Sequence, residues 1–305
     1  MKRFLIVGLL SMTFVAISYV STHETLCSGF LPENDMQIPV SDFATTGLTE
    51  QEFNAVMDKY EAIYRPIITK EGGNLVLNRR WKDATVNASA TRLWNQWYVN
   101  MYGGLARFPG MTPDGMTLVV CHETGHHLGR APYAGPLRLG WATNEGGADY
   151  YSALKCARRV FAADDNEKIV SALGVDPMIS TKCAENFKDS KDIAICMRSA
   201  HAGTVLASVL SAMSKDPVAP QVSTPDQKVV TAIYDAHPES QCRLDTYLQA
   251  SICQVSESAP LDIRNYHINS CVGPKFKEGM RPNCWFKPDV ADGASAVPTN
   301  LVGSI

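Results

Sequence analysis

Residues 122–129 read HETGHHLG, which places three histidines and one glutamate in little more than one helical turn. Positions i and i+4 of an α-helix leave the same face, so the rings of His122 and His126 would point in one direction. Two such rings suit a metal ion, and Glu123 would flank that ion as a general base, as in zinc hydrolases. H-E-x-x-H also arises by chance, so the motif alone does not identify a metal site. Support has to come from further residues of the chain that fit such a site.

The residues around this motif fit a helix with defined ends. Thr112 is a typical N-cap, Pro113 is favoured at the first helical position, and Gly129 is typical of a C-terminal end. A second helix is expected from Asn144, after a loop that contains proline and glycine. The sequence therefore predicts two consecutive helices, and the first carries the histidines.

The pattern elsewhere predicts a mainly helical α+β fold with a small sheet. Apolar residues recur at helical spacing over 50–68, where Thr49 is the expected N-cap. Residues 96–102 alternate like a strand with one buried face. Two more strands are expected at 74–78 and 85–90, and further helices at 193–213, 227–236 and 241–252.

A zinc ion held by two histidines needs a third protein ligand, and the second helix offers one at its start. Glu145 follows Asn144 directly, and Asp149 lies four residues later on the same helical face. Asp149 would accept the outer ring N–H of a zinc-bound histidine, His122 in first place, and so fix its orientation. Alternatively, both acids only stabilise the start of the helix through its dipole. The spacing favours a ligand with a supporting carboxylate, and predicts one Zn²⁺ per chain.

These motifs resemble those of the gluzincin metallopeptidases, which combine H-E-x-x-H with a glutamate ligand. The similarity is greatest to the branch with the HtpX heat-shock protease, the CAAX prenyl protease and the periplasmic protease BepA. Residues 86–90 resemble the N-A-x-A strand of that branch, 145–149 match its E-x-x-A-D, and 237–238 with Arg243 match its H-P…R segment. The resemblance covers about 49–248.

The resemblance implies a compact zincin-like protease domain, with the active-site helix packed beneath a small sheet beside it. It also implies zinc ligation by His122, His126 and Glu145. His237 and Arg243 would lie near the ion and donate hydrogen bonds to the oxyanion of the reaction.

The chain departs from that family at His127 and in its cysteines. His127 lies about 100° round the helix from its neighbour, so it cannot share the ion and is expected to be packed or hydrogen-bonded. Nine cysteines indicate disulfides in an exported protein, with one cysteine left over. The spacing alone does not fix the connectivity; Cys121–Cys156 and Cys271–Cys284 are the pairs that we expect.

The N-terminus predicts export. Lys2 and Arg3 precede an apolar run over 4–20, so residues 1–21 are typical of a signal peptide, with an uncleaved membrane anchor as the alternative. Lipid attachment at Cys27 is not favoured, because the three residues before it form a poor lipidation site. No later apolar run is long enough to span a bilayer, so we expect no stable membrane insertion after cleavage, and a periplasmic or secreted protein.

We expect a metallopeptidase domain over 22–253 and a loop-rich segment with cysteines and a flexible tail over 254–305. The formal net charge of −3 leaves no basic footprint for nucleic acid. The expected function is a zinc-dependent endopeptidase that acts on peptides or unfolded exported proteins. The substrate would add to the strand at 96–102 as to a free sheet edge.

Two other functions remain open at this stage. One is a zinc-containing, peptide-binding protein without proteolysis, although the intact Glu123 argues against a purely structural site. The other is a self-inhibited protease whose C-terminal segment covers the cleft. Metal analysis and peptide hydrolysis with a Glu123→Gln variant separate catalysis from binding.

Overall fold

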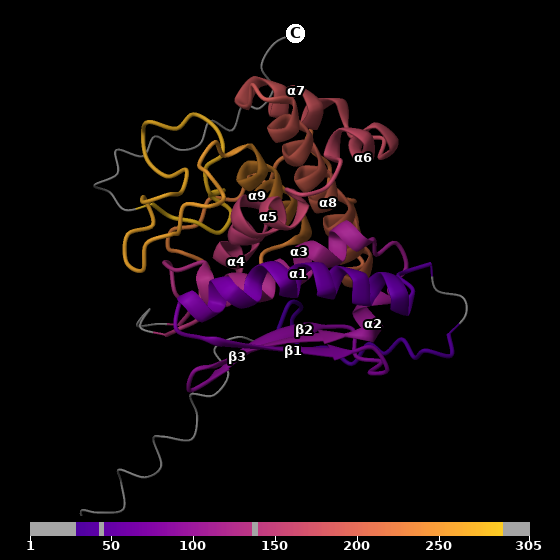
Figure 1. Cartoon of the computed structure of the whole chain (residues 1–305). Coiled ribbons are helices and arrows are strands. Elements are labelled where there is room, and N and C mark those ends of the chain that lie inside the picture. Colours follow the sequence, from indigo (N-terminus) through magenta and orange to yellow (C-terminus); the bar gives the residue numbers. More distant parts are fainter. Residues whose placement is uncertain (1–28, 43–45, 136–139, 289–305) are drawn as a thin grey trace, which may run out of the picture.

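The computed structural model describes residues 29–42, 46–135 and 140–288. The expected signal peptide, Cys27 and the C-terminal tail lie outside these ranges. The described residues form an α+β fold, in which a small sheet makes up one layer and helices make up the layers above it (Figure 1).

The sheet consists of β1 (Asn74–Arg80), β2 (Ala88–Leu93) and β3 (Gln96–Tyr102). The strand order is β1-β3-β2, with β3 parallel to β1 and antiparallel to β2. The strand expected at 96–102 is confirmed, but its expected role as a free edge is wrong, because strands pair with it on both sides. The edges of the sheet are β1 and β2, and β2 begins later than the expected residue 85.

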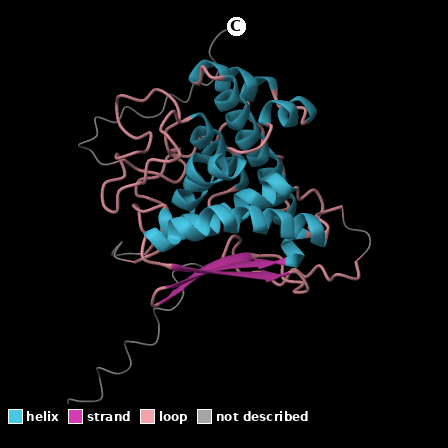
Figure 2. Ribbon diagram, in the orientation of Figure 1, coloured by secondary structure: helices cyan, strands magenta, loops and turns pink. Residues whose placement is uncertain are grey.

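Helix α1 (Glu50–Lys70) and helix α3 (Pro113–Leu128) pack on the sheet, which forms a separate layer below the helices (Figure 2). α1 begins at the expected N-cap, where the side chains of Thr49 and Glu52 form a capping box. On β3 the side chains of 97, 99 and 101 are buried and the alternate ones are half-buried. This alternation shows that the face with residues 97, 99 and 101 points inward.

Helix α3 has the expected ends. Thr112 Oγ1 accepts the N–H of Gly115 at 3.1 Å, and Pro113 is the first helical residue. At the other end, the Gly129 N–H donates to Gly125 O at 2.7 Å. Every residue from Gly115 to Leu128 is buried, so the histidines lie in the interior of the protein.

The helix expected from Asn144 is present as α4 (Glu145–Tyr151), a π-helical turn η1 (Ser152–Ala157) and α5 (Arg158–Phe161). Asn144 is its N-cap and accepts the Gly147 N–H at 3.1 Å. The amide group of Asn144 also donates to Tyr234 O at 3.0 Å. The cap therefore starts the helix and ties it to a distant part of the chain.

The remaining helices are α2 (Gly103–Ala106), α6 (Asn166–Ala172), α7 (Pro177–Asn186), α8 (Ser190–Ser214) and α9 (Ser240–Ile252). α8 and α9 confirm two expected helices. The helix expected at 227–236 is wrong. The N–H groups of Val230 and Tyr234 donate instead to the carbonyls of Asn283 and Trp285, so this backbone pairs with the C-terminal segment.

Helix α8 is the one described helix that is long and apolar enough to cross a membrane by length and composition. Of its most apolar window, 61% is buried inside the protein. A core helix meets the same criteria, and α8 packs against α9, α3 and α7.

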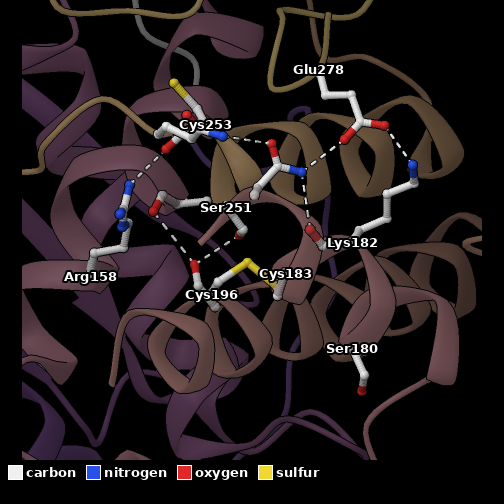
Figure 3. Close-up of a disulfide and its surroundings, with 12 residues drawn as sticks. Arg158, Ser180, Lys182, Cys183, Cys196, Ser251, Cys253 and Glu278 are labelled. Carbon is white, nitrogen blue, oxygen red and sulfur yellow. Dashed lines mark hydrogen bonds and ion pairs between the residues drawn. A yellow bond between two sulfur atoms is a disulfide. The ribbon is translucent and has the colours of Figure 1, made fainter. Parts of the chain in front are cut away.

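Four disulfides join the cysteines of the described ranges: Cys121–Cys156, Cys183–Cys196, Cys242–Cys284 and Cys253–Cys271. The first confirms the pair expected between the histidine-bearing helix and the next one. The second joins α7 to α8 (Figure 3). Four disulfides in one chain indicate that it folds in an oxidising compartment.

The expected pair Cys271–Cys284 is wrong. Cys284 bonds to Cys242 near the start of α9, and Cys271 bonds to Cys253 just after the end of α9. Both cysteines come from a loop-rich segment that follows α9, and the long helix offers a partner at each end. The segment is thereby fastened along α9 rather than to itself.

Residues 254–288 contain no helix or strand, yet they form part of the protein interior. Trp285 and Phe286 are almost fully buried and belong to the same hydrophobic core as α3 and α4. Glu278 contacts Lys182 on α7 (Figure 3) and accepts a hydrogen bond from Asn186 Nδ2 at 2.8 Å. The segment therefore packs against the helices from two sides.

Candidate metal centre

Helices α3 and α4 approach closely enough to share one site. Gly125 of α3 faces Ala148 of α4 so tightly that a Cβ on Gly125 would lie 2.7 Å from Ala148 O. Two small residues are needed for this contact. It sets His122 and His126 beside Glu145, the first residue of α4.

The three predicted ligands converge on one point. His122 Nε2 lies 3.1 Å from His126 Nε2 and 3.2 Å from Glu145 Oε2. His126 Nε2 lies 3.8 Å from Glu145 Oε1. In a tetrahedral zinc site with bonds of about 2.0–2.1 Å, two ligand atoms lie about 3.3 Å apart. The spacing and the donor set therefore fit a zinc ion.

The outer nitrogen of each ring has an acceptor that fixes its orientation. His122 Nδ1 lies 2.7 Å from Asp149 Oδ1, which is the contact expected from the sequence. His126 Nδ1 lies 2.8 Å from Thr143 O. When each Nδ1 donates its proton outward, both Nε2 lone pairs face the shared point, as metal ligation requires.

The charges at this point favour a cation. Burial opposes ionisation of Glu145, but His126 and His122 hold its pKa at about 2. Burial lowers the pKa of His126 to about 4, so this ring is neutral. Burial also opposes charging of His122, yet Asp149 outweighs it and raises the pKa of His122 to about 9. Without metal the His122 ring is therefore protonated on both nitrogens, and a divalent ion would displace the Nε2 proton.

Glu123 is buried beside the ligands without a partner. Its side chain is fully buried, and neither carboxylate oxygen has a hydrogen-bond partner among the described residues. Burial raises the pKa of Glu123 to about 8. A buried carboxyl group without a partner is costly, so its retention next to a metal-ligand cluster points to a chemical role.

Asp149 lies at the centre of a buried network behind the ligands. Arg243 contacts it through two hydrogen bonds, Nε to Oδ2 at 2.8 Å and Nη2 to Oδ1 at 2.8 Å. Tyr247 adds a third, from its hydroxyl to Oδ1 at 2.7 Å. Burial opposes ionisation of Asp149, but Arg243 and His122 hold its pKa below its usual range. The ionised carboxylate thus fixes the His122 ring.

His237 and Arg243 both come to the site, in different places. His237 Nε2 lies 3.4 Å from Glu145 Oε2 and donates to the carbonyl of Gly29 at 2.8 Å. Arg243 uses its third donor, Nη1, on Phe30 O at 3.0 Å. The position of His237 suits the expected oxyanion donor, whereas the contacts of Arg243 suit a residue that positions Asp149.

His127 is packed and hydrogen-bonded, as expected. Its Nδ1 accepts from Arg92 Nε at 3.1 Å, its Nε2 lies 3.0 Å from Tyr98 O, and its ring stacks between Trp97 and Trp141. Burial lowers the pKa of His127 to about 3. It takes no part in the metal centre.

Three further residues of the site did not emerge from the sequence. Tyr247 follows Arg243 by one helical turn, so the i, i+4 spacing on α9 could have indicated it. Thr143 and Phe30 contribute backbone carbonyls, which carry no signal in the residue type. Phe30 also places its ring edge-on to His122, with 5.1 Å between ring centroids.

The arrangement combines two histidine ring nitrogens, one ionised carboxylate, a second carboxyl group beside them and a nearby N–H donor. Such a set can hold a divalent metal, remove a proton from water and stabilise a developing oxyanion. No protein-family model, no curated protein and no solved structure matches this chain.

Proposed function

We propose that this chain is a zinc-dependent endopeptidase whose ion is held by His122, His126 and Glu145. One observation carries the proposal: Glu123 is buried without a partner directly beside the three convergent ligands. A structural zinc site has four protein ligands and no use for a base, whereas a catalytic site keeps one position open next to one.

The residues of the chain divide the reaction between them. His122, His126 and Glu145 would hold the zinc ion, and a bound ion would supply Lewis-acid activation of the attacking water and of the scissile carbonyl. In its ionised form, Glu123 would take the proton of the attacking water and deliver it to the departing amine. His237 Nε2, which already donates to a peptide carbonyl, would donate to the oxyanion. Asp149 keeps the His122 ring in place.

The substrate would bind as an extended strand. β2 is an edge of the sheet and packs against α3, so a peptide added to its outer side would run past the ligands. Backbone pairing of this kind tolerates many sequences and requires an unfolded segment. We therefore propose that the substrates are peptides or unfolded proteins.

A zincin-like fold and the gluzincin family belong to the same proposal. The helix with H-E-x-x-H under a small sheet, and the E-x-x-A-D helix packed on it, support both. The four disulfides fit action in the periplasm or outside the cell.

Metal analysis and peptide hydrolysis test the proposal together. We expect one zinc per chain in the wild type and in Glu123→Gln, with hydrolysis of a fluorogenic peptide or a reduced, unfolded protein lost only in the variant. Removal of Glu123 should lower kcat by about a hundredfold or more, the usual contribution of general acid–base catalysis. Equal hydrolysis in both proteins, or no zinc in either, would refute the proposal.

A further inference from the structure

The first described residues of the chain run along the sheet. The Phe30 N–H donates to Ala88 O at 2.9 Å, and the Val86 N–H donates to Met36 O at 3.2 Å. Ile38 N–H then donates to Ala84 O at 2.8 Å. Later residues of the N-terminal segment pair with earlier residues of 84–88, so the two segments are antiparallel. Traced towards its start, the segment therefore leads to β2.

This end of the segment lies at the metal centre. Gly29 O accepts the hydrogen bond from His237 Nε2 at 2.8 Å, and the same nitrogen is 3.4 Å from Glu145 Oε2. The Phe30 carbonyl accepts a hydrogen bond from Arg243, and the fully buried ring of Phe30 contacts His122. The Gly29 carbonyl thus accepts the hydrogen bond of His237 Nε2, the N–H that would donate to the carbonyl of a substrate.

The metal centre is closed in this arrangement. His122 and Glu123 have no exposed surface, His126 is 1% exposed and Glu145 is 5% exposed. An endopeptidase has to bring a substrate carbonyl within bonding distance of its ion. Some covering part of the protein therefore has to move, and the segment with Gly29 and Phe30 covers His122 directly.

The attachment of this segment is local. Gly29 has φ +104°, and a Cβ on it would lie 2.7 Å from Ala88 O. Leu31 N–H donates to Asn87 Oδ1 at 2.9 Å, and Asn87 Nδ2 donates to Leu31 O at 3.2 Å. The next residue, Pro32, is exposed. These hydrogen bonds and the packing of Phe30 and Leu31 in the hydrophobic core hold the end of the segment in place, so its opening has to expose these two side chains while the rest of the core stays folded.

We propose that Gly29–Leu31 is a strap that lies at the substrate edge of the sheet and closes the metal centre until a peptide displaces it. The strap rests on the proposed function, because it regulates the same site. It places a backbone carbonyl on His237 and a backbone N–H on the strand that leads into β2, as an extended substrate would. The activity of the chain is then limited by opening of the strap.

Two strap variants and two matched controls test this in the full-length, zinc-loaded protein. Gly29→Ala adds a Cβ against Ala88 O, and Gly72→Ala is its control, because Gly72 also has positive φ but no neighbour within 4 Å. Phe30→Ala removes the cover of His122, and Met36→Ala is its control farther along the same segment. Thermal unfolding verifies that each variant is folded.

The first measurement is transfer of zinc to a chromogenic chelator, which does not depend on catalysis. We expect Gly29→Ala and Phe30→Ala to accelerate transfer about tenfold, with both controls within about twofold of wild type. The second measurement is peptide hydrolysis, which should rise in the two strap variants. Folded strap variants that lose zinc no faster than their controls would refute the strap.

The two proposals fail in different ways. Faster zinc transfer without any Glu123-dependent hydrolysis supports the strap and refutes the peptidase. Glu123-dependent hydrolysis with equal zinc transfer in strap variants and controls supports the peptidase and refutes the strap.

Discussion

Asp149 shows how a single buried carboxylate can organise a candidate metal centre. It receives hydrogen bonds from His122, Arg243 and Tyr247, and all three residues are buried. The charges of Asp149 and Arg243 balance each other, so the pair can be buried at an acceptable cost. The result is a rigid support on the side of His122 that faces away from the ligands.

The contribution of Tyr247 to this support can be isolated. Tyr247→Phe removes one hydrogen bond to Asp149 and leaves the ring in place. We expect zinc affinity to fall about fivefold, which corresponds to one hydrogen bond of about 1 kcal/mol. Competition with a chelator of known affinity measures the change.

Tyr150→Phe provides the matched control for that measurement. Tyr150 is also fully buried, but its hydroxyl donates to Gly279 O, away from Asp149. Tyr150→Phe should lower the free energy of unfolding by about 1 kcal/mol and leave zinc affinity unchanged. If both variants weaken zinc equally, the Tyr247 hydroxyl acts through general stability and not through Asp149.

At the scale of the elements, the candidate metal centre depends on the contact between α3 and α4. Neither helix holds three ligands, since His122 and His126 come from one and Glu145 from the other. Gly125 and Ala148 set the distance between the helices. Gly125 and Ala148 are not ligands, but their contact determines whether His122, His126 and Glu145 meet.

Gly125→Ala tests this contact. Its Cβ would lie 2.7 Å from a backbone oxygen and 2.8 Å from a backbone Cα of Ala148, so the helices have to separate. We expect a loss of about 1–3 kcal/mol in stability from overpacking. Zinc affinity should also fall by about tenfold or more, as when the support of a metal ligand is lost. Chelator competition and urea unfolding measure the two effects.

Gly115→Ala in the same helix is the control. Its Cβ would meet Met111 Sδ and Thr112 Oγ1 at 3.3 Å, which requires a much smaller shift than the contacts of a Cβ on Gly125 with the backbone of Ala148. The higher helix propensity of alanine, by about 1 kcal/mol, offsets this crowding. Zinc affinity should stay at the wild-type value. A Gly125→Ala variant with unchanged affinity would show that the helices tolerate separation.

The sequence predicts those elements whose signals are local. Thr112, Pro113 and Gly129 predict the ends of α3, and Thr49 predicts the start of α1, because capping involves residues within one turn. The spacing of His122, His126, Glu145 and Asp149 predicts which side chains meet. The helix ends and the shared face of His122 and His126 follow from the geometry of one helix, whereas the approach of Glu145 from a second helix is expected from the resemblance to the gluzincin motifs.

The failed predictions concern pairing between distant segments. Residues 227–236 have helical spacing, but their backbone bonds to residues near Trp285. The position of β3 in the middle of the sheet depends on β1 and β2 together. Disulfide partners such as Cys242 and Cys284 are likewise set by how the C-terminal segment runs along α9. Such contacts leave no signal in local spacing.

At the scale of the whole molecule, the C-terminal segment packs behind the candidate metal centre. Trp285 packs on Gly146, the neighbour of Glu145, so closely that a Cβ on Gly146 would lie 2.2 Å from its ring. Its indole N–H donates to Thr246 Oγ1 on α9 at 3.0 Å. The disulfide Cys242–Cys284 lies one residue before both Arg243 and Trp285. This segment thus connects α4 to the helix that holds Asp149.

Removal of single disulfides tests whether this support reaches the ion. The chain lengths between the cysteines, 42 residues for Cys242–Cys284 and 13 for Cys183–Cys196, give similar entropic contributions of about 4 and about 3 kcal/mol. We expect both double Cys→Ser variants to lose stability, measured by urea unfolding. Only loss of Cys242–Cys284 should also weaken zinc binding, by about tenfold, because it frees the residues around Arg243 and Trp285.

Cys183–Cys196 lies in a separate hydrophobic cluster with α7, and its removal should leave zinc affinity unchanged. Equal losses of zinc affinity in the two variants would mean that stability in general, and not the C-terminal segment, governs the metal centre.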